Sequence, residues 1–172
     1  MDIDGIIALI QNGKMDEAKV LCSETLRFNS RKGHEAFGYF YLKLKHYDAS
    51  VIHFLKSLNE GNISDSVFRG LGYAYFGSGN YGEASKYFSR VKEKDVDDYF
   101  MLFTSSLMLK DPVSARSYLD MAYDLDPDRT KELMRTLFSS LIAPSTELTD
   151  EQKRAVEKRI EMYLEEKAGG GS

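Results

Sequence analysis

Apolar residues recur at three- and four-residue spacing along most of the chain, which is the period of an amphipathic α-helix. Between residues 64 and 78 the apolar stripe consists of Val67, Phe68, Leu71, Tyr75 and Phe76. The next segment carries a second stripe of Ala84, Tyr87, Phe88 and Val91. Between the two lies GSGNYG (residues 77–82), which is rich in residues that interrupt helices. The pattern therefore predicts two short helices joined by a turn.

This hairpin pattern repeats along the chain. The segment FGYFYLKLKHYDASVIHFLKSL, which starts at Phe37, aligns at an offset of 34 residues with LGYAYFGSGNYGEASKYFSRVK, which starts at Leu71. Weaker copies lie on both sides. The small residues of the four copies are at positions 18, 50, 84 and 115, which are 32, 34 and 31 residues apart. A period of this length is typical of helical-repeat solenoids.

The two central copies resemble the signature of the tetratricopeptide repeat. The third copy reads Phe68-x-x-Leu71-Gly72-x-x-Tyr75 and then Ala84-x-x-x-Phe88. The second reads His34-x-x-Phe37-Gly38-x-x-Tyr41 and then Ser50-x-x-x-Phe54. In the first and fourth copies Ile6 and Phe103 replace the small residue of the first helix, so the register of the fourth copy stays open. Only the fourth copy keeps the late proline, Pro127.

The resemblance implies an all-α, right-handed superhelix of four helical hairpins, at about residues 1–30, 31–64, 65–95 and 96–129, with a concave face built from the first helices. Two capping helices are expected over 130–168, because a solenoid needs an end with a polar face. The first carries the stripe Leu133, Leu137, Phe138, Leu141 and Ile142, and a capping box of Thr149 and Gln152 opens the second. Residues 169–172 are interpreted as a linker.

Gly38 and Gly72 lie in the middle of predicted helices, where glycine costs about 1 kcal/mol relative to alanine. We expect the neighbouring helix to approach closely at these points, so that a Cβ would be in the way. Ala84, on the second helix of the same hairpin as Gly72, is expected to be small for the same reason.

Composition narrows the class of protein. The net charge of −4 leaves no basic surface for a nucleic acid, and no apolar run approaches the roughly 18 residues of a membrane span. The first residues show no signal peptide. The single cysteine, Cys22, cannot form an internal disulfide, which fits a reducing compartment. We therefore expect a soluble, cytoplasmic protein.

The candidate chemistry is weak. GSGNYG matches G-x-G-x-x-G, but a dinucleotide-binding loop must follow a strand, and the second copy has KLKHYD at the same place. His34, His46 and His53 include no pair at the i, i+4 spacing of helical zinc ligands. Cys22 stands at a core position. We therefore expect no catalytic residues, no cofactor and no metal.

Peptide binding is the function that the repeat pattern favours. By repeat phase, the concave groove is expected to be lined by Ile7, Ile10, Glu35, Tyr39, Leu42, Lys43, Arg69, Tyr73, Phe76, Phe100, Thr104 and Leu107. The expected partner is an extended or helical, mainly apolar protein segment. Lys43 and Arg69 would stand beside the groove and hold an acidic residue of this partner.

Three alternatives stay open. Some of these residues could instead be covered by the C-terminal helices and belong to the core. The chain could be a self-assembly unit whose last helix docks into the groove of the same or another copy. An unrecognised enzyme is the third. The groove's character is otherwise similar to that of the small tetratricopeptide chaperones of bacterial secretion systems, which implies a scaffold or chaperone-like role.

Overall fold

The structure is a computed structural model that describes residues 3–169. Within that range the chain forms ten α-helices and a short π-helix and contains no strand. In chain order these are α1 (Ile3–Gln11), α2 (Met15–Phe28), α3 (Ser30–Lys43), α4 (Tyr47–Asn59), α5 (Asp65–Gly77), α6 (Tyr81–Arg90), α7 (Val96–Met108), α8 (Pro112–Leu125), α9 (Pro127–Leu137), η1 (Phe138–Ile142) and α10 (Asp150–Gly169). The all-α prediction is confirmed.

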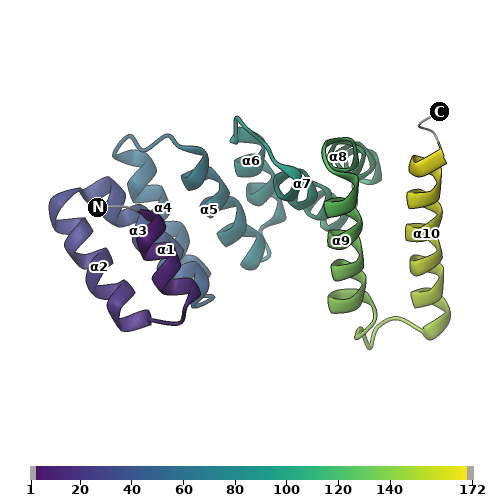
Figure 1. Ribbon diagram of the computed structural model, residues 1–172, viewed down its shortest axis with the longest axis horizontal. Helices are drawn as coiled ribbons and strands as arrows, with labels where there is room; N and C mark the ends of the chain where they lie inside the picture. The colour runs from purple at the N-terminus through teal and green to yellow at the C-terminus, as the bar shows by residue number, and fades with distance from the viewer. Residues whose placement is uncertain (1–2, 170–172) are drawn as a thin grey trace.

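Successive helices pack as antiparallel hairpins that follow one another from α1 to α8, with α9 and α10 at the far end (Figure 1). The hairpins span residues 3–28, 30–59, 65–90 and 96–125. These are the segments in which the four repeats are expected, although the repeat boundaries themselves stay a prediction. The expected linker at 169–172 begins inside α10, and residues 170–172 lie outside the described range.

The turn within each hairpin has the same construction four times. Each contains one residue with positive φ: Gly13 (74°), Lys45 (59°), Gly79 (80°) and Lys110 (59°). The N–H of the following residue donates to the carbonyl five residues earlier, as in Asn80 N–H to Tyr75 O at 2.9 Å. This is the Schellman way of ending a helix, and it satisfies carbonyls that would otherwise lack a partner. The centre of GSGNYG, residues 78–80, is therefore an interhelical turn, as predicted, and its outer residues belong to α5 and α6.

These turns also settle the register of the fourth hairpin. Each positive-φ residue lies five positions before the small residue of its second helix, so the turns share the 32, 34 and 31 spacing of positions 18, 50, 84 and 115. Because Lys110 corresponds to Gly79, Phe103 corresponds to Gly72. In the fourth repeat the bulky Phe103 therefore stands at the position that Gly72 occupies in the third.

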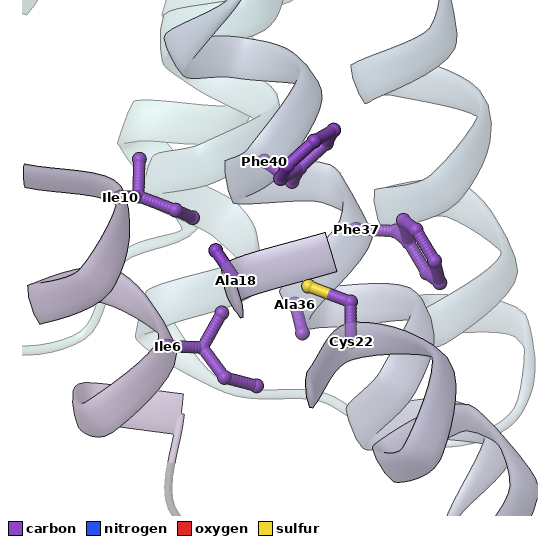
Figure 2. Close-up of a cluster of buried hydrophobic side chains, with 7 residues drawn as sticks. All are labelled: Ile6, Ile10, Ala18, Cys22, Ala36, Phe37 and Phe40. Atoms are coloured by element: carbon purple, nitrogen blue, oxygen red, sulfur yellow. The ribbon is translucent and has the colours of Figure 1, made fainter. Parts of the chain in front are cut away.

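The core of the first hairpin is formed by α1, α2 and α3 (Figure 2). Its buried side chains are Ile6, Ile10, Ala18, Cys22, Ala36, Phe37 and Phe40. Cys22 is fully buried, as predicted, and burial raises the pKa of its thiol to about 11. The thiol is therefore protonated at neutral pH and packs as a small apolar group.

The mid-helix glycines make room for aromatic rings. A Cβ on Gly38 would lie 2.7 Å from the Phe54 ring, and one on Gly72 would lie 2.7 Å from the Phe88 ring. Close approach within the hairpin is further shown by Ser50, whose hydroxyl donates to the Gly38 carbonyl at 2.8 Å. The predicted approach is confirmed, and the side chain that needs the space beside Gly72 is Phe88.

The C-terminal helices differ from the repeat. The predicted capping box is present, because Thr149 N–H donates to Gln152 Oε1 at 2.8 Å and Gln152 N–H donates to Thr149 Oγ1 at 3.2 Å. The stripe expected on the preceding helix is wrong at Leu141, whose side chain is 61% exposed. The π-helix at 138–142 explains this, since its wider turn rotates Leu141 away from the face that α9 buries.

No helix within residues 3–169 is both long enough and apolar enough to cross a membrane.

Candidate functional site

An apolar groove opens between the first helices of three successive hairpins, α1, α3 and α5. Its cavity measures about 710 Å³ and is lined by Ile7, Ile10, Tyr39, Leu42, Lys43, Lys45, Tyr47, Tyr73, Phe76 and Gly77. These residues come from the C-terminal half of each first helix, from the turn that follows α3, and from Tyr47 at the start of α4. We call this surface the first-helix groove.

The groove brings together seven of the residues expected from the sequence. They are Ile7, Ile10, Tyr39, Leu42, Lys43, Tyr73 and Phe76. Ile10 also belongs to the core of the first hairpin and is 4% exposed, so it forms the floor of the groove.

Two expected residues have structural partners instead. Glu35 is 1% exposed, and its carboxylate accepts hydrogen bonds from Asn62 Nδ2 at 2.7 Å and Lys32 Nζ at 3.1 Å. Arg69 donates to both carboxylate oxygens of the buried Asp98 at 2.8–3.0 Å. Neither side chain lines the groove cavity, and Arg69 is already paired with an anion of its own chain.

The three expected residues of the fourth repeat also lie elsewhere. Phe100 packs in a buried cluster with Tyr163 of α10. Thr104 is buried, and its hydroxyl donates to the Phe100 carbonyl at 3.1 Å. Leu107 lines a different cavity, beside α8, α9 and α10. For Phe100, the alternative that the C-terminal helices cover part of the expected groove therefore holds.

Lys45, Tyr47 and Gly77 line the groove but were not expected from the sequence. The ring of Tyr47 lies against Gly77, where an added Cβ would be 2.3 Å from the ring. A signal was available for one of them, because Tyr47 and Tyr81 recur at the repeat offset of 34 residues. Repeat phase assigned only first helices to the concave face, so residues of the turn and of α4 were left out.

Tyr39 and Tyr73, two of the three tyrosines that line the groove, are held by the rings of the repeat core. Tyr39 meets Phe54 edge-on, with ring centroids 5.0 Å apart, and Tyr73 meets Phe88 in the same way at 5.1 Å. The Tyr39 hydroxyl donates to the Ser66 carbonyl at 2.8 Å. Burial raises the pKa of each tyrosine to about 12, so both are neutral. They offer fixed aromatic faces to a partner.

The charged side chains that line the groove are those of Lys43 and Lys45. Lys43 and Lys45 are exposed, and neither forms an ion pair with another residue of the range 3–169. Within the same range no group of three His, Cys, Asp or Glu side chains could hold a metal ion. The site can therefore bury apolar surface and attract a negative charge.

Comparison with known proteins agrees with this arrangement. The model of the tetratricopeptide repeat family matches residues 70–93, which cover most of the third hairpin. Superkiller protein 3 of Schizosaccharomyces pombe is 28% identical over 100 residues, which are 58% of this chain and 7% of that protein. A pentatricopeptide repeat-containing protein of Arabidopsis thaliana is 36% identical over 73 residues, which are 41% of this chain and 14% of that protein. The chain thus spans a small part of these relatives.

Solved structures share the fold. PilF of Pseudomonas aeruginosa aligns with a TM-score of 0.70 and 17% identity over 99% of this chain and 75% of that chain. The Cut9–Hcn1 hetero-tetramer of the APC/C aligns with a TM-score of 0.66 and 17% identity, over 94% of this chain and 31% of that chain. MamA aligns with a TM-score of 0.60 and 19% identity, over 75% of this chain and 79% of that chain.

Stacked antiparallel hairpins with a repeated turn and a repeated Gly–Phe contact define a helical-repeat solenoid. The residues that repeat are those of the tetratricopeptide signature, and the chain contains a match to the tetratricopeptide repeat family over residues 70–93. Its architecture is that of a scaffold for protein–protein interaction.

Proposed function

We propose that this chain binds an extended or helical, mainly apolar segment of a partner protein in the first-helix groove, and that it is not an enzyme. The observation that carries the proposal is the groove itself, in which Tyr39, Tyr73 and Phe76 stand half-buried around a cavity of about 710 Å³. Contiguous apolar surface of this kind is typical of interaction sites.

The fixed tyrosines favour tight binding. Rigid aromatic side chains give a large contact area and lose little conformational entropy when a partner binds. Because Phe54 and Phe88 already support the two rings, little further ordering is needed. We therefore expect most of the binding energy to come from Tyr73, Phe76 and Leu42, the half-buried side chains of the cavity.

The charges select among apolar partners. Lys43 and Lys45 have no carboxylate partner among the described residues, so an acidic residue in the bound segment would gain an ion pair there. Exposed pairs of this kind contribute little affinity but guide orientation and association. The proposed partner is thus an apolar segment with one or two acidic residues. The Cut9–Hcn1 complex shows a neighbour of this fold that assembles with another protein.

The second candidate is self-assembly, in which α10 docks into the groove of another copy. In its own chain α10 contacts α8. It stands at the opposite end of the solenoid from α1 and α3 (Figure 1) and does not line the first-helix groove. Tyr163 Oη donates to Asp120 Oδ1 at 3.0 Å, and Arg116 pairs with Glu166 at 3.0 Å. Docking into another copy would require these contacts to break, so we favour a separate partner. We also propose a cytoplasmic location, in keeping with the unpaired Cys22.

Panning a displayed peptide library against the purified chain tests the proposal. We expect enrichment of apolar peptides that carry an acidic residue, and loss of their binding in Phe76→Glu and Leu42→Glu. Ile52→Glu is the matched control, because Ile52 is a 53% exposed apolar residue of α4 outside the groove. Enriched peptides that bind Phe76→Glu as well as the original chain would exclude the groove as the site.

A further inference from the structure

A second cavity lies at the other end of the solenoid, between α10 and the helices α7, α8 and α9. It measures about 340 Å³. Its lining is apolar apart from two arginines and consists of Phe103, Leu107, Pro112, Ala115, Arg116, Leu119, Met134, Leu137, Phe138, Ile142, Val156, Arg159, Ile160 and Tyr163. We call it the C-terminal cavity. None of its lining residues belongs to the first-helix groove.

The cavity exists because this part of the chain departs from the repeat. In the third hairpin the ring of Phe88 fills the space that Gly72 leaves. In the fourth, Phe103 and Leu119 replace that pair, and both line the cavity. The π-helix adds Phe138 and Ile142, one wide turn apart, to the same wall. π-Helical turns often occur at functional sites.

Helix α10 covers the cavity without filling it. Tyr163 is its one buried side chain among residues 150–169, whereas Val156 and Ile160 are only half-buried. Its side chains form hydrogen bonds and ion pairs with Asp120, Asp124 and Arg116 of α8. Toward α9 the contact is purely apolar, through Leu133 and Leu137. The helix is thus held by polar contacts along the edge that faces α8 and by apolar contacts along the edge that faces α9.

The lining and the volume indicate the class of ligand. Apolar cavities bind apolar molecules, and since one of about 150 Å³ accommodates a benzene ring, about 340 Å³ can take roughly ten to twelve carbon atoms. The two arginines give the cavity a positive edge. Arg116 is already paired with Asp120 and Glu166, whereas Arg159 is exposed and pairs with no residue in the described range.

We propose that the C-terminal cavity binds a medium-chain fatty acid, with the alkyl chain between Phe103, Leu119 and Met134 and the carboxylate at Arg159. The volume suits one such chain and is too small for the two long chains of a membrane phospholipid. The ligand would fill the space beneath α10 and so fix this helix on the solenoid. This binding is independent of the partner in the first-helix groove.

Titration of the full chain with sodium decanoate tests the proposal. We expect saturable binding by calorimetry, a higher melting temperature, and NMR shifts of the Val156, Ile142 and Ile160 methyl groups. The Ile7 and Ile10 methyl groups report on the first-helix groove, and their NMR signals should not shift. If only the groove methyls shift, or if no saturable binding occurs, the proposal is wrong.

Two pairs of variants locate the ligand. Val156→Phe should weaken decanoate binding about tenfold by filling the cavity, whereas Leu42→Phe, which fills the first-helix groove, should leave the affinity unchanged.

Arg159→Ala should weaken decanoate binding about fivefold and leave 1-decanol binding unchanged. Arg154→Ala, on the same helix but outside the cavity, is its control. Equal affinity for decanoate and decanol in the unmodified chain would exclude the carboxylate contact. Unchanged decanoate binding in Val156→Phe would exclude the cavity.

Discussion

The ring of Tyr73 meets the ring of Phe88 edge-on, at a centroid distance of 5.1 Å and an interplanar angle of 87°. Phe88 itself occupies the space left by Gly72, the residue that precedes Tyr73 in the chain. Gly38, Tyr39 and Phe54 repeat this relationship, with ring centroids 5.0 Å apart. The residues that define the repeat therefore also place the aromatic face of the groove.

Gly72→Ala is expected to lower the free energy of unfolding by about 1–2 kcal/mol. The added Cβ would lie 2.7 Å from the Phe88 ring, and overpacking of this kind outweighs the gain in helix propensity of about 1 kcal/mol. Urea unfolding followed by circular dichroism measures the change. Gly82→Ala is the control, because a Cβ there meets nothing within 4 Å. Equal stability of the two variants would contradict the close approach.

Substitutions at two equivalent turn positions are expected to change the stability of the chain in opposite directions. Gly79 has a φ of 80°, so Gly79→Ala should cost about 1 kcal/mol of stability. Lys110 stands at the equivalent position with a φ of 59°, so Lys110→Gly should stabilise the chain by up to about 1 kcal/mol. Thermal unfolding of both variants checks this. NAD should bind neither the original chain nor Gly79→Ala in calorimetry, because the G-x-G-x-x-G stretch is only a turn.

Arg69→Met is expected to destabilise the chain by about 2 kcal/mol. The substitution leaves the carboxylate of Asp98, which is 1% exposed, without its bidentate partner, and an unpaired buried charge is costly. The value is reduced because Arg69 itself is 29% exposed. Arg69→Met with Asp98→Asn should recover part of the loss. If Arg69→Met unfolds at the same urea concentration as the original chain, the pair makes no contribution to stability.

Arg69 also shows what the sequence could and could not predict. Hairpins, turns and core followed from the spacing of Ala18, Ser50, Ala84 and Ala115, because each hairpin repeats the same local contacts. Repeat phase likewise placed Tyr39 and Tyr73 on the groove. Repeat phase could not show that Arg69 forms an ion pair with Asp98 of the next repeat, because neither residue recurs in the other repeats.

The C-terminal end was the least predictable part for the same reason. Phe100 has the phase of a groove residue, but α10 folds back on α8 and buries it in the cluster with Tyr163. The π-helix at 138–142 has no counterpart in the repeat and alters the face of α9. Where the chain leaves the repeat, the neighbours of each side chain depend on how non-repeating helices pack.

Acid is expected to destabilise the second hairpin through His53. Its Nδ1 lies 3.1 Å from Nδ1 of His34, and Lys56 and the partly exposed Glu60 are the charged groups nearby. Burial, helped by His34, lowers the pKa of His53 from 6.5 to about 4. Between these values the unfolded chain binds a proton that the folded chain does not, so stability falls as the pH drops from about 6.5 to about 4.

Melting temperatures at pH 7 and pH 5 measure this effect. His53→Gln should be less sensitive to the change, because it has no proton to bind, and His46→Gln serves as the control on an exposed histidine. A pH dependence in His53→Gln equal to that of the original chain would show that other groups cause it.

Deleting residues 147–169 separates the proposed partner binding from self-assembly. The deletion removes α10 and exposes Phe100 and Tyr123, which pack with Tyr163, so the melting temperature should fall. The first-helix groove lies on α1, α3 and α5, away from α10, and the affinity for a selected peptide should stay the same. Tyr73→Ala should instead weaken the binding of that peptide by about 2 kcal/mol, since interface energy concentrates in a few aromatic anchors. If α10 occupied the groove of another copy, the deletion would strengthen peptide binding and remove any dimer seen by analytical ultracentrifugation. Unchanged peptide binding in Tyr73→Ala would place the site outside the groove.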